Sequence, residues 1–377
     1  MNFELTDEQR LIGQSARAFA KEYLDPIAAD LDHSGTYPKA IIEQLAGYDF
    51  LGLLLPEEVG GAAAGAVSYI EVIEALSRSC PAVATILNNH TLGALAVVDW
   101  GSDKQKKDYA PALAKGERLA TLAIYEKGPA PGVGPDALLA ARQGEHYVLN
   151  GTKAFVRNAG VADLYVVFAT LEPAPDKRAL SVFLVDARTP GLTIGPRLET
   201  MGLKACPVAH VIFSNVSVPA AALVGGENGG TAIATTLLAK AAVFEAAQTV
   251  GIGKAAVKHA ADYAKQRVQF GRPIASLQAI QTLLADVATD AHLAWLGVQR
   301  TAQLIEDGQP FETDAAMVKA FLARVGSKML IDTVQVEGGF GYSEFMPLPR
   351  LFRDIAGTTL LDAPADFPDE IIAEAIA

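Results

Sequence analysis

The pattern of apolar and polar positions divides the chain into a helical first part, a β-rich middle part and a helical last part. In the first part, apolar residues recur at helical spacing. The run from Thr6 has the Thr-Asp-Glu-Gln form of a capping box and predicts a helix from Asp7. Further helices are predicted from Lys39, from about Val67 and from the run that begins at Gly101.

The middle part, residues 118–226, contains short β-prone runs separated by Pro, Gly and Asp. Asn150 and Gly151 lie between β-prone flanks and predict a hairpin turn. Strands are predicted at 164–169, 180–185 and 210–213. Because no helical pattern separates these strands, we expect an antiparallel sandwich or barrel.

The last part, from residue 227, is rich in alanine and helical in pattern. It predicts helices of roughly forty, thirty and twenty-five residues, which Gly and Pro interrupt. Antiparallel helices of these lengths form a bundle, and their apolar faces can also meet other subunits. The sequence therefore predicts an α+β fold with a helical domain at 1–117, a β domain at 118–226 and a helical bundle at 227–377.

One stretch of the last part contains residues that are candidates for binding a ligand. The run from Tyr263 to Pro273 predicts the end of a long helix and a turn, and Gln278 opens the next helix. Arg267 and Phe270 are three positions apart, so we expect them to share one face of the closing helical turn. A guanidinium, a ring and an amide at one corner suit a flat, anionic cofactor with a pyrophosphate. A capped helical hairpin with a solvated Arg is the alternative.

Composition narrows the range of partners. The formal net charge is −12, and 50% of the residues are hydrophobic. A chain this acidic is not expected to bind nucleic acid. The two cysteines and six histidines lack metal-ligand spacing, so no metal site is expected. The apolar stretch 231–257 contains Lys240 and Glu245, which favours a buried helix over a membrane span. With no secretory signal at its start, the sequence predicts a cytoplasmic protein.

Short motifs along the chain resemble, in order, those of the acyl-CoA dehydrogenase family. They are Leu5-Thr-Asp-Glu-Gln9, Leu53-Leu-Leu-Pro-Glu-Glu-Val-Gly-Gly61, Gly101-Ser-Asp-Lys-Gln-Lys106, Leu149-Asn-Gly-Thr-Lys153, Met201-Gly-Leu-Lys204, Gln266-Arg-Val-Gln-Phe-Gly-Arg-Pro273, Gln335-Val-Glu-Gly-Gly-Phe-Gly-Tyr342 and Leu351-Phe-Arg-Asp354. The resemblance covers essentially the whole length. It implies FAD as cofactor and α,β-dehydrogenation of an acyl-CoA thioester, in which a carboxylate removes the α-proton and the β-hydrogen passes as hydride to the flavin.

The resemblance also implies a tetramer in which each subunit completes its neighbour's cofactor site. Arg267, Phe270 and Gln278 would contact the adenosine diphosphate part of a neighbour's FAD. Gln335 and Gly339 would face the same cofactor, because paired glycines allow close backbone approach. Electron-transfer flavoprotein is the acceptor that the resemblance implies.

The catalytic base is less clearly matched. The family's common base is a Glu eight residues after the Asp of the Arg-Asp pair, and here Asp362 follows Asp354 at that distance. We predict Asp362 as the base, with a solvated Asp as the alternative. Some relatives place the base on the first bundle helix, where this chain has Ala241. Glu245, one turn further, is a second candidate base; its alternative is a hydrogen-bonded structural Glu.

The residues expected beside the chain's own flavin depart from the family pattern. Ile124 and Tyr125 stand at the segment that usually offers a hydroxyl to the flavin. Phe155 and Arg157 stand where the family has Trp-Ile-Thr-Asn. Phe155 can still pack against the flavin, whereas Arg157 either favours the reduced, anionic flavin or occupies the space of the cofactor.

The residues that would contact a neighbour's FAD thus match the family pattern, whereas the residues beside the subunit's own FAD do not. This combination resembles the mixed tetramers that act on CoA esters of sterol side chains and ring fragments in steroid catabolism and lipid degradation. The leading hypothesis is an FAD-dependent dehydrogenase of a bulky acyl-CoA, in a homo- or heterotetramer. The alternatives are a non-catalytic partner subunit and a desulfinase- or monooxygenase-type relative.

Overall fold

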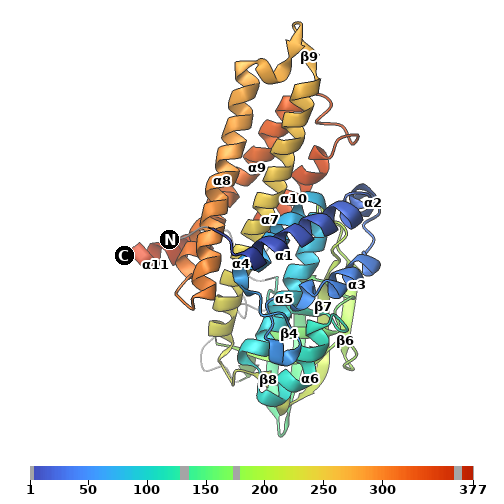
Figure 1. Ribbon diagram of the computed structural model, residues 1–377. Coiled ribbons are helices and arrows are strands. Elements are labelled where there is room, and N and C mark those ends of the chain that lie inside the picture. The colour runs from blue at the N-terminus through green and yellow to red at the C-terminus, as the bar shows by residue number, and fades with distance from the viewer. Residues whose placement is uncertain (1–3, 128–135, 173–178, 361–366, 377) are drawn as a thin grey trace.

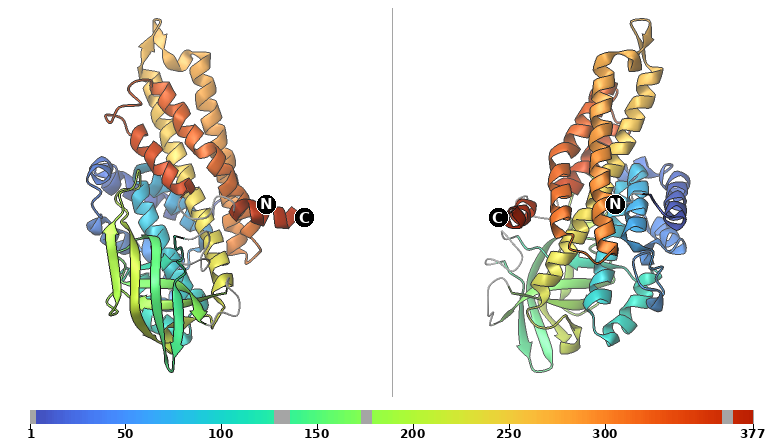
Figure 2. Two further views of the ribbon diagram at one scale, coloured as in Figure 1. Left: turned by 180° about the vertical axis from the view of Figure 1, so that it is seen from behind. Right: turned by 60° about the vertical axis from the view of Figure 1, so that its left-hand side comes forward.

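The computed structural model describes residues 4–127, 136–172, 179–360 and 367–376. The long helices of the last part project from a body that the first and middle parts form together (Figure 1). Seen from behind, the sheet lies against the helices of the first part, at the opposite end of the molecule from the bundle tip (Figure 2).

Local signals in the first part produce its helices. At the start of α1, the Thr6 hydroxyl accepts a hydrogen bond from the Gln9 backbone, and the Gln9 side chain accepts one from Thr6 N. Ser102 and Gln105 form the same capping box at α6. The single helix predicted from about Val67 is two helices, because Pro81 begins a second one. The helices are α1 Asp7–Phe19, α2 Ala28–Ser34, α3 Lys39–Gly47, α4 Gly65–Ser79, α5 Pro81–Trp100 and α6 Asp103–Ala114, with a π-helical turn at Ala20–Leu24.

The middle part forms one sheet in the order β6-β7-β3-β2-β4-β5-β8, with β1 also paired to β4. The strands are β1 Ala120–Ala123, β2 Leu139–Gln143, β3 His146–Arg157, β4 Leu164–Glu172, β5 Leu180–Asp186, β6 Leu192–Arg197, β7 Val208–Pro219 and β8 Leu223–Val224. Most neighbours are antiparallel, as expected, but β4 runs parallel to β1 and β2. The sheet is therefore mixed. Between β2 and β4 the chain runs back along β3, so β4 has the same direction as β2.

The predicted turn at Asn150 and Gly151 is wrong. Both residues lie inside β3, where the register against β7 shifts between Leu149 and Gly151. Gly151 has a φ of 139°, and a Cβ there would lie 2.9 Å from the Leu138 backbone. The glycine therefore serves a β-bulge at a close chain crossing. The turn between β2 and β3 instead lies at Gly144.

The last part has the predicted lengths: α7 Gly230–Gln266 has 37 residues, α8 Gln278–Glu306 has 29 and α9 Glu312–Glu337 has 26. Two shorter helices follow, α10 Leu348–Leu360 and α11 Phe367–Ile376, and both pack against α9. One hydrophobic core spans the first part, one face of the sheet and the bundle, and a second core lies within the β domain. Within the described residues, α5 and α7 are long and apolar enough to cross a membrane, but 94% and 61% of their apolar windows are buried in the fold.

Candidate active site

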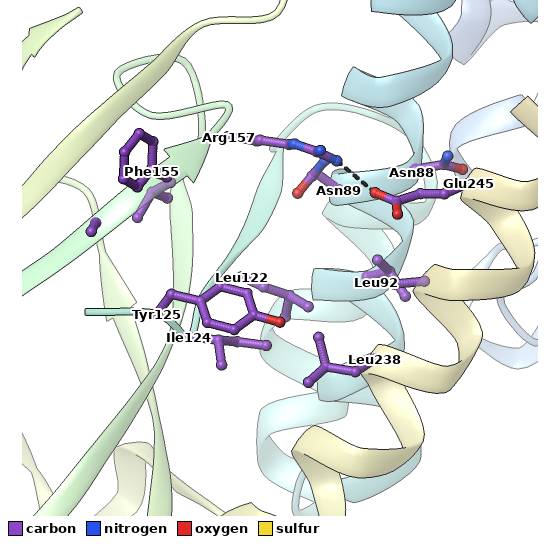
Figure 3. Close-up of a pocket in the computed structure, with 13 residues that line it drawn as sticks. Asn88, Asn89, Leu92, Leu122, Ile124, Tyr125, Phe155, Arg157, Leu238 and Glu245 are labelled. Atoms are coloured by element: carbon purple, nitrogen blue, oxygen red, sulfur yellow. Dashed lines mark hydrogen bonds and ion pairs between the residues drawn. The ribbon is translucent and has the colours of Figure 1, made fainter. Parts of the chain in front are cut away.

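A pocket lies where β1 and β3 meet α5 and α7 (Figure 3). Its lining residues are Asn88, Asn89, Leu92, Leu122, Ile124, Tyr125, Ala154, Phe155, Val156, Arg157, Leu238, Ala241 and Glu245. The sequence predicted five of these as site residues: Ile124, Tyr125, Phe155, Arg157 and Glu245. The fold thus brings residues from three separate segments of the chain, 124–125, 155–157 and 245, into one pocket.

Arg157 and Glu245 are joined across this pocket. Arg157 Nη1 lies 2.8 Å from Glu245 Oε1, and the two side chains are only 7% and 3% exposed. The other carboxylate oxygen of Glu245 accepts a hydrogen bond from Lys319 Nζ on α9. Since a buried carboxylate requires such partners, two cations account for its presence in an alanine-rich helix. Both oxygens of Glu245 are engaged, which favours the structural interpretation of this residue.

The other predicted base, Asp362, lies outside the described residues. The helix that precedes it in the chain, α10, is anchored to the Arg157–Glu245–Lys319 cluster. Lys319 Nζ donates to Thr358 O at 2.6 Å, and Arg157 Nη2 donates to Gly357 O at 3.4 Å.

A second pocket lies on the other side of Arg157, between the sheet and α10. It is lined by Phe155, Arg157, the segment 198–202, Val208, Arg353, Ala356 and Gly357. At the segment 198–202 the chain passes close to α10, because a Cβ on Gly202 would lie only 2.2 Å from Arg353 O. Phe155 has a φ of 51° and is 57% exposed, so its ring is available at the mouth of both pockets.

Tyr125 lies beside Ile124 with its hydroxyl directed toward α5 and α7 (Figure 3). Burial and the nearby Glu245 carboxylate raise its pKa, so the phenol stays protonated at neutral pH. The segment that carries it is held by Lys153, which donates to Ile124 O at 2.6 Å and pairs with Glu126. The Tyr125 hydroxyl therefore lies in the pocket against α5 and α7, at the segment where the resemblance implies a hydroxyl beside the flavin.

A third pocket lies at the tip of the bundle, where α7 and α9 end. It brings together the predicted residues Arg267, Gln335 and Gly339, with Tyr263, Phe340 and Phe345 beside them. The space over Gly339 is open, since nothing lies within 4 Å of a Cβ built there. Phe270, 88% exposed, and the exposed Gln278 do not line this pocket.

The predicted placement of Arg267 and Phe270 on one helical turn is wrong. The helix α7 ends at Gln266, and a short hairpin of β9 Val268–Gln269 and β10 Arg272–Pro273 follows. Phe270 and Gly271 have φ values of 53° and 75°. Because this left-handed backbone suits a two-residue hairpin turn, the Phe270 ring is carried beyond the end of the helix.

Sequence reasoning missed Lys319, Lys153 and Glu126. Lys319 is a single cation among apolar neighbours in the chain, and the side chains of all three residues are at most 9% exposed. That signal predicts a buried charge, but it cannot name the partner, which lies far away in the sequence.

Comparison with known proteins identifies all three parts. Residues 6–117, 132–216 and 228–377 match the models of the acyl-CoA dehydrogenase N-terminal, middle and C-terminal domains. An acyl-CoA dehydrogenase of Bacillus subtilis is 37% identical over 371 residues, 98% of each chain. The acryloyl-CoA reductase (NADH) of Anaerotignum propionicum is 34% identical, covering 100% of this chain and 96% of the relative.

Solved structures of acyl-CoA dehydrogenases and related flavoproteins have the same fold. Butyryl-CoA dehydrogenase from Megasphaera elsdenii superposes with a TM-score of 0.94 at 31% identity, covering 100% of both chains. The FAD complex of PigA superposes with a TM-score of 0.93 at 26% identity, covering 100% of this chain and 99% of that one. The chain belongs to the acyl-CoA dehydrogenase family, whose members are FAD-dependent oxidoreductases.

Proposed function

We propose that this chain dehydrogenates a bulky acyl-CoA thioester between its α- and β-carbons as one subunit of a mixed tetramer. The observation that carries the proposal is the pair of pockets that share Phe155 and Arg157. The pocket between the sheet and α10 suits the flavin ring, and the pocket against α5 and α7 suits the acyl group. On α7 the wall of this pocket is formed by Leu238, the small Ala241 and Glu245.

The residues present fit the cofactor. Phe155 offers an exposed ring for stacking, and the segment 198–202, which passes close to α10 at Gly202, lines the same pocket. Arg157 places a cation held by Glu245 at the same pocket. When bound, FAD accepts the hydride that leaves the β-carbon. Asp362 takes the α-proton, and the electron pair of the broken α-C–H bond becomes the new carbon–carbon double bond.

The tip of the bundle would serve the neighbouring subunit. Arg267 supplies a planar, charged donor for the pyrophosphate, and Phe270 supplies an exposed stacking face. A homologous subunit would contribute the reciprocal half-site. Electron-transfer flavoprotein is the proposed acceptor, and the cytoplasm the proposed location.

A non-catalytic partner subunit is the second candidate. Arg157 and Tyr125 are large side chains at positions where the family has small hydroxyl residues. Both line the acyl pocket, and Arg157 also lines the pocket assigned to the flavin ring, where it would occupy the space of the cofactor. Under this alternative the chain completes a homologue's FAD site through its bundle tip and binds no flavin of its own.

The visible spectrum of the purified chain, alone and co-expressed with a homologous subunit, separates these candidates. We expect flavin absorbance that bleaches anaerobically on addition of a bulky acyl-CoA. A colourless protein that becomes yellow only with the homologue supports the non-catalytic partner. A flavin that never bleaches with any acyl-CoA, with or without the homologue, contradicts the dehydrogenase.

The identity of the base is tested by Asp362→Asn beside Glu245→Gln. We expect Asp362→Asn to abolish bleaching while FAD stays bound. Bleaching that survives both substitutions would contradict a carboxylate base and favour a desulfinase- or monooxygenase-type reaction. Because some relatives at 33% and 34% identity are named as reductases, reoxidation of reduced flavin by an enoyl-CoA is measured in the same experiment.

A further inference from the structure

Two motifs from distant parts of the chain, Met201-Gly-Leu-Lys204 and Leu351-Phe-Arg-Asp354, meet in the folded protein. On α10, Asp354 Oδ1 accepts a hydrogen bond from Leu203 N at 2.6 Å. Beside it, Arg353 Nη1 donates to Met201 O at 3.1 Å. Two adjacent residues of α10 therefore hold the backbone on both sides of Gly202.

The backbone that Asp354 holds has an uncommon conformation. Leu203 has a φ of 53°, in the left-handed region, which residues with a Cβ seldom adopt. A Cβ on the preceding Gly202 would lie 2.6 Å from Asp354 N. Such conformations persist only where the surroundings fix them, and they gather at functional sites. Here the bond to Asp354 and the burial of the Leu203 side chain provide that constraint.

The position of Asp354 in the fold is unfavourable for an aspartate. It lies in the interior of α10 and is 3% exposed, although aspartate is a poor helix former and a buried carboxylate costs free energy. Burial raises the pKa of Asp354 to about 6, while the bond from Leu203 N and the nearby Arg350 oppose that shift. At neutral pH the carboxyl is therefore mainly ionised, which strengthens its bond to a backbone N–H.

The segment that Asp354 holds lines the pocket between the sheet and α10. Residues 198–202 form one part of its lining, and Phe155 and Arg157 form another. Asp354 is not among the lining residues within the described part of the chain. Any effect of Asp354 on this pocket is therefore transmitted through Leu203 and Gly202.

We propose that Asp354 is a positioning residue for the flavin, because its bond to Leu203 N fixes the segment 198–202 as a wall of the flavin pocket. This inference rests on the proposed function, which assigns that pocket to the flavin ring. It adds a residue that touches neither the flavin nor the acyl group. Since the protein groups around a flavin tune its electronic properties, a displaced wall should change the spectrum of the bound flavin.

The test compares Asp354→Leu and Asp354→Asn with Asp163→Leu. Leucine is similar in shape to aspartate but has no acceptor, whereas an asparagine Oδ1 can still accept from Leu203 N. Asp163 is the matched control, because its Oδ2 accepts a hydrogen bond from Leu119 N at 2.9 Å. Neither Asp163 nor Leu119 lines the flavin pocket or the acyl pocket.

The first measurement is hydrogen exchange in the cofactor-free proteins, which requires neither flavin nor substrate. In Asp354→Leu we expect exchange in peptides covering 198–204 to accelerate by roughly 10-fold, with normal exchange at Leu119. Asp163→Leu should show the reverse pattern. Asp354→Asn should retain most of the protection at 198–204.

The second measurement is FAD titration, with each protein alone and with a homologous subunit, followed by the visible spectrum. Asp354→Leu should bind FAD roughly 10-fold more weakly, and the absorbance maximum of the bound flavin should shift. Asp354→Asn and Asp163→Leu should keep the normal spectrum and an affinity within about 3-fold of normal. If Asp354→Leu is insoluble, Asp354→Ser takes its place, because the shorter side chain also leaves Leu203 N without its acceptor.

The inference is wrong if Asp354→Leu keeps normal exchange at 198–204, or if it binds FAD with normal affinity and spectrum. It is equally wrong if Asp163→Leu changes the flavin spectrum to the same extent. An unsubstituted protein that binds no FAD, alone or with the homologous subunit, overturns the proposed function and this inference together. Normal FAD binding and bleaching, with no effect of Asp354→Leu on either measurement, overturns this inference alone.

Discussion

Lys153 and Glu126 form an ion pair in which neither side chain is exposed to solvent. The pair joins β3 to the segment that carries Ile124 and Tyr125, because Lys153 Nζ also donates to Ile124 O. Burial lowers the pKa of Lys153 to about 8, while the Glu126 carboxylate opposes that shift. Lys153 thus stabilises the wall of the acyl pocket through contacts that have no access to water.

Removal of this cation should destabilise the protein strongly. We expect Lys153→Met to lower the free energy of unfolding by about 3–5 kcal/mol, because it takes the cation from a buried carboxylate. Lys104→Met is the matched control, since its pair with Asp108 is 78% and 47% exposed and should contribute no more than about 1 kcal/mol. Urea denaturation measures both, and the double variant Lys153→Met with Glu126→Gln should recover part of the loss. Equal effects at the two lysines would contradict this account.

The close approach at Gly202 should tolerate no side chain. A Cβ there would lie 2.2 Å from Arg353 O and 2.6 Å from Asp354 N, so Gly202→Ala must push the segment 198–202 away from α10. We expect a loss of stability of about 1–3 kcal/mol and weaker FAD retention. Gly47→Ala is the control, because nothing lies within 4 Å of its Cβ and alanine favours a helix. Thermal melting measures the loss of stability, and FAD titration measures cofactor affinity. If Gly202→Ala changes neither, the close contact between Gly202 and α10 is not required.

The exposed ring of Phe270 should affect cofactor binding far more than folding. Since the side chain is 88% exposed, Phe270→Ala should change the melting temperature of the cofactor-free subunit by less than a few degrees. In the assembled tetramer it should lower FAD affinity by roughly 10-fold, because a stacking contact to the neighbour's cofactor is lost. Leu11→Ala, at a 64% exposed position on α1, is the control. Unchanged FAD affinity in Phe270→Ala would mean that Phe270 does not contact the neighbour's FAD.

Glu337 should make stability depend on pH. Its side chain is fully buried, and neither carboxylate oxygen has a hydrogen-bond partner among the described residues, although His259 Nε2 lies 3.4 Å away. Burial raises the pKa of Glu337 to about 7 from an ordinary value of 4.5. Between these values the folded protein holds a proton that the unfolded chain releases, so this group's contribution to stability falls as pH rises through that window.

The check is the melting temperature of Glu337→Gln between pH 5 and 8. Burial also lowers the pKa of His259, and the charged groups beside that histidine are Asp262, Lys258 and Glu337 itself. The imidazole is therefore expected to be neutral at the upper end of this range. We expect the unsubstituted protein to lose several degrees more than the variant as pH rises. If the melting temperatures of the two proteins change in parallel with pH, the pKa of Glu337 is not raised and its carboxylate has a stabilising partner in the folded protein.

Local signals in the sequence were sufficient for most elements of the fold. The capping box at Thr6 and the breaks at 271–273, 308–310 and 338–339 act within a few residues, so they predicted helix starts and lengths without tertiary information. The ordered motifs identified the family, and Arg267, Gln335 and Gly339 do meet in one pocket. The Asn-Gly pair failed as a predictor, because the same glycine chemistry serves a turn or a bulge and the neighbouring strand decides between them.

The sequence by itself therefore determined most of the helices and the family. Only the tertiary structure decided what Glu245 does. Arg157 is 88 positions before it and Lys319 is 74 after it, and no periodicity connects residues so far apart. Buried charges choose partners by proximity in the folded state, because each must offset its own loss of hydration there. For that reason a candidate base on α7 became the centre of a buried ion cluster that anchors α10.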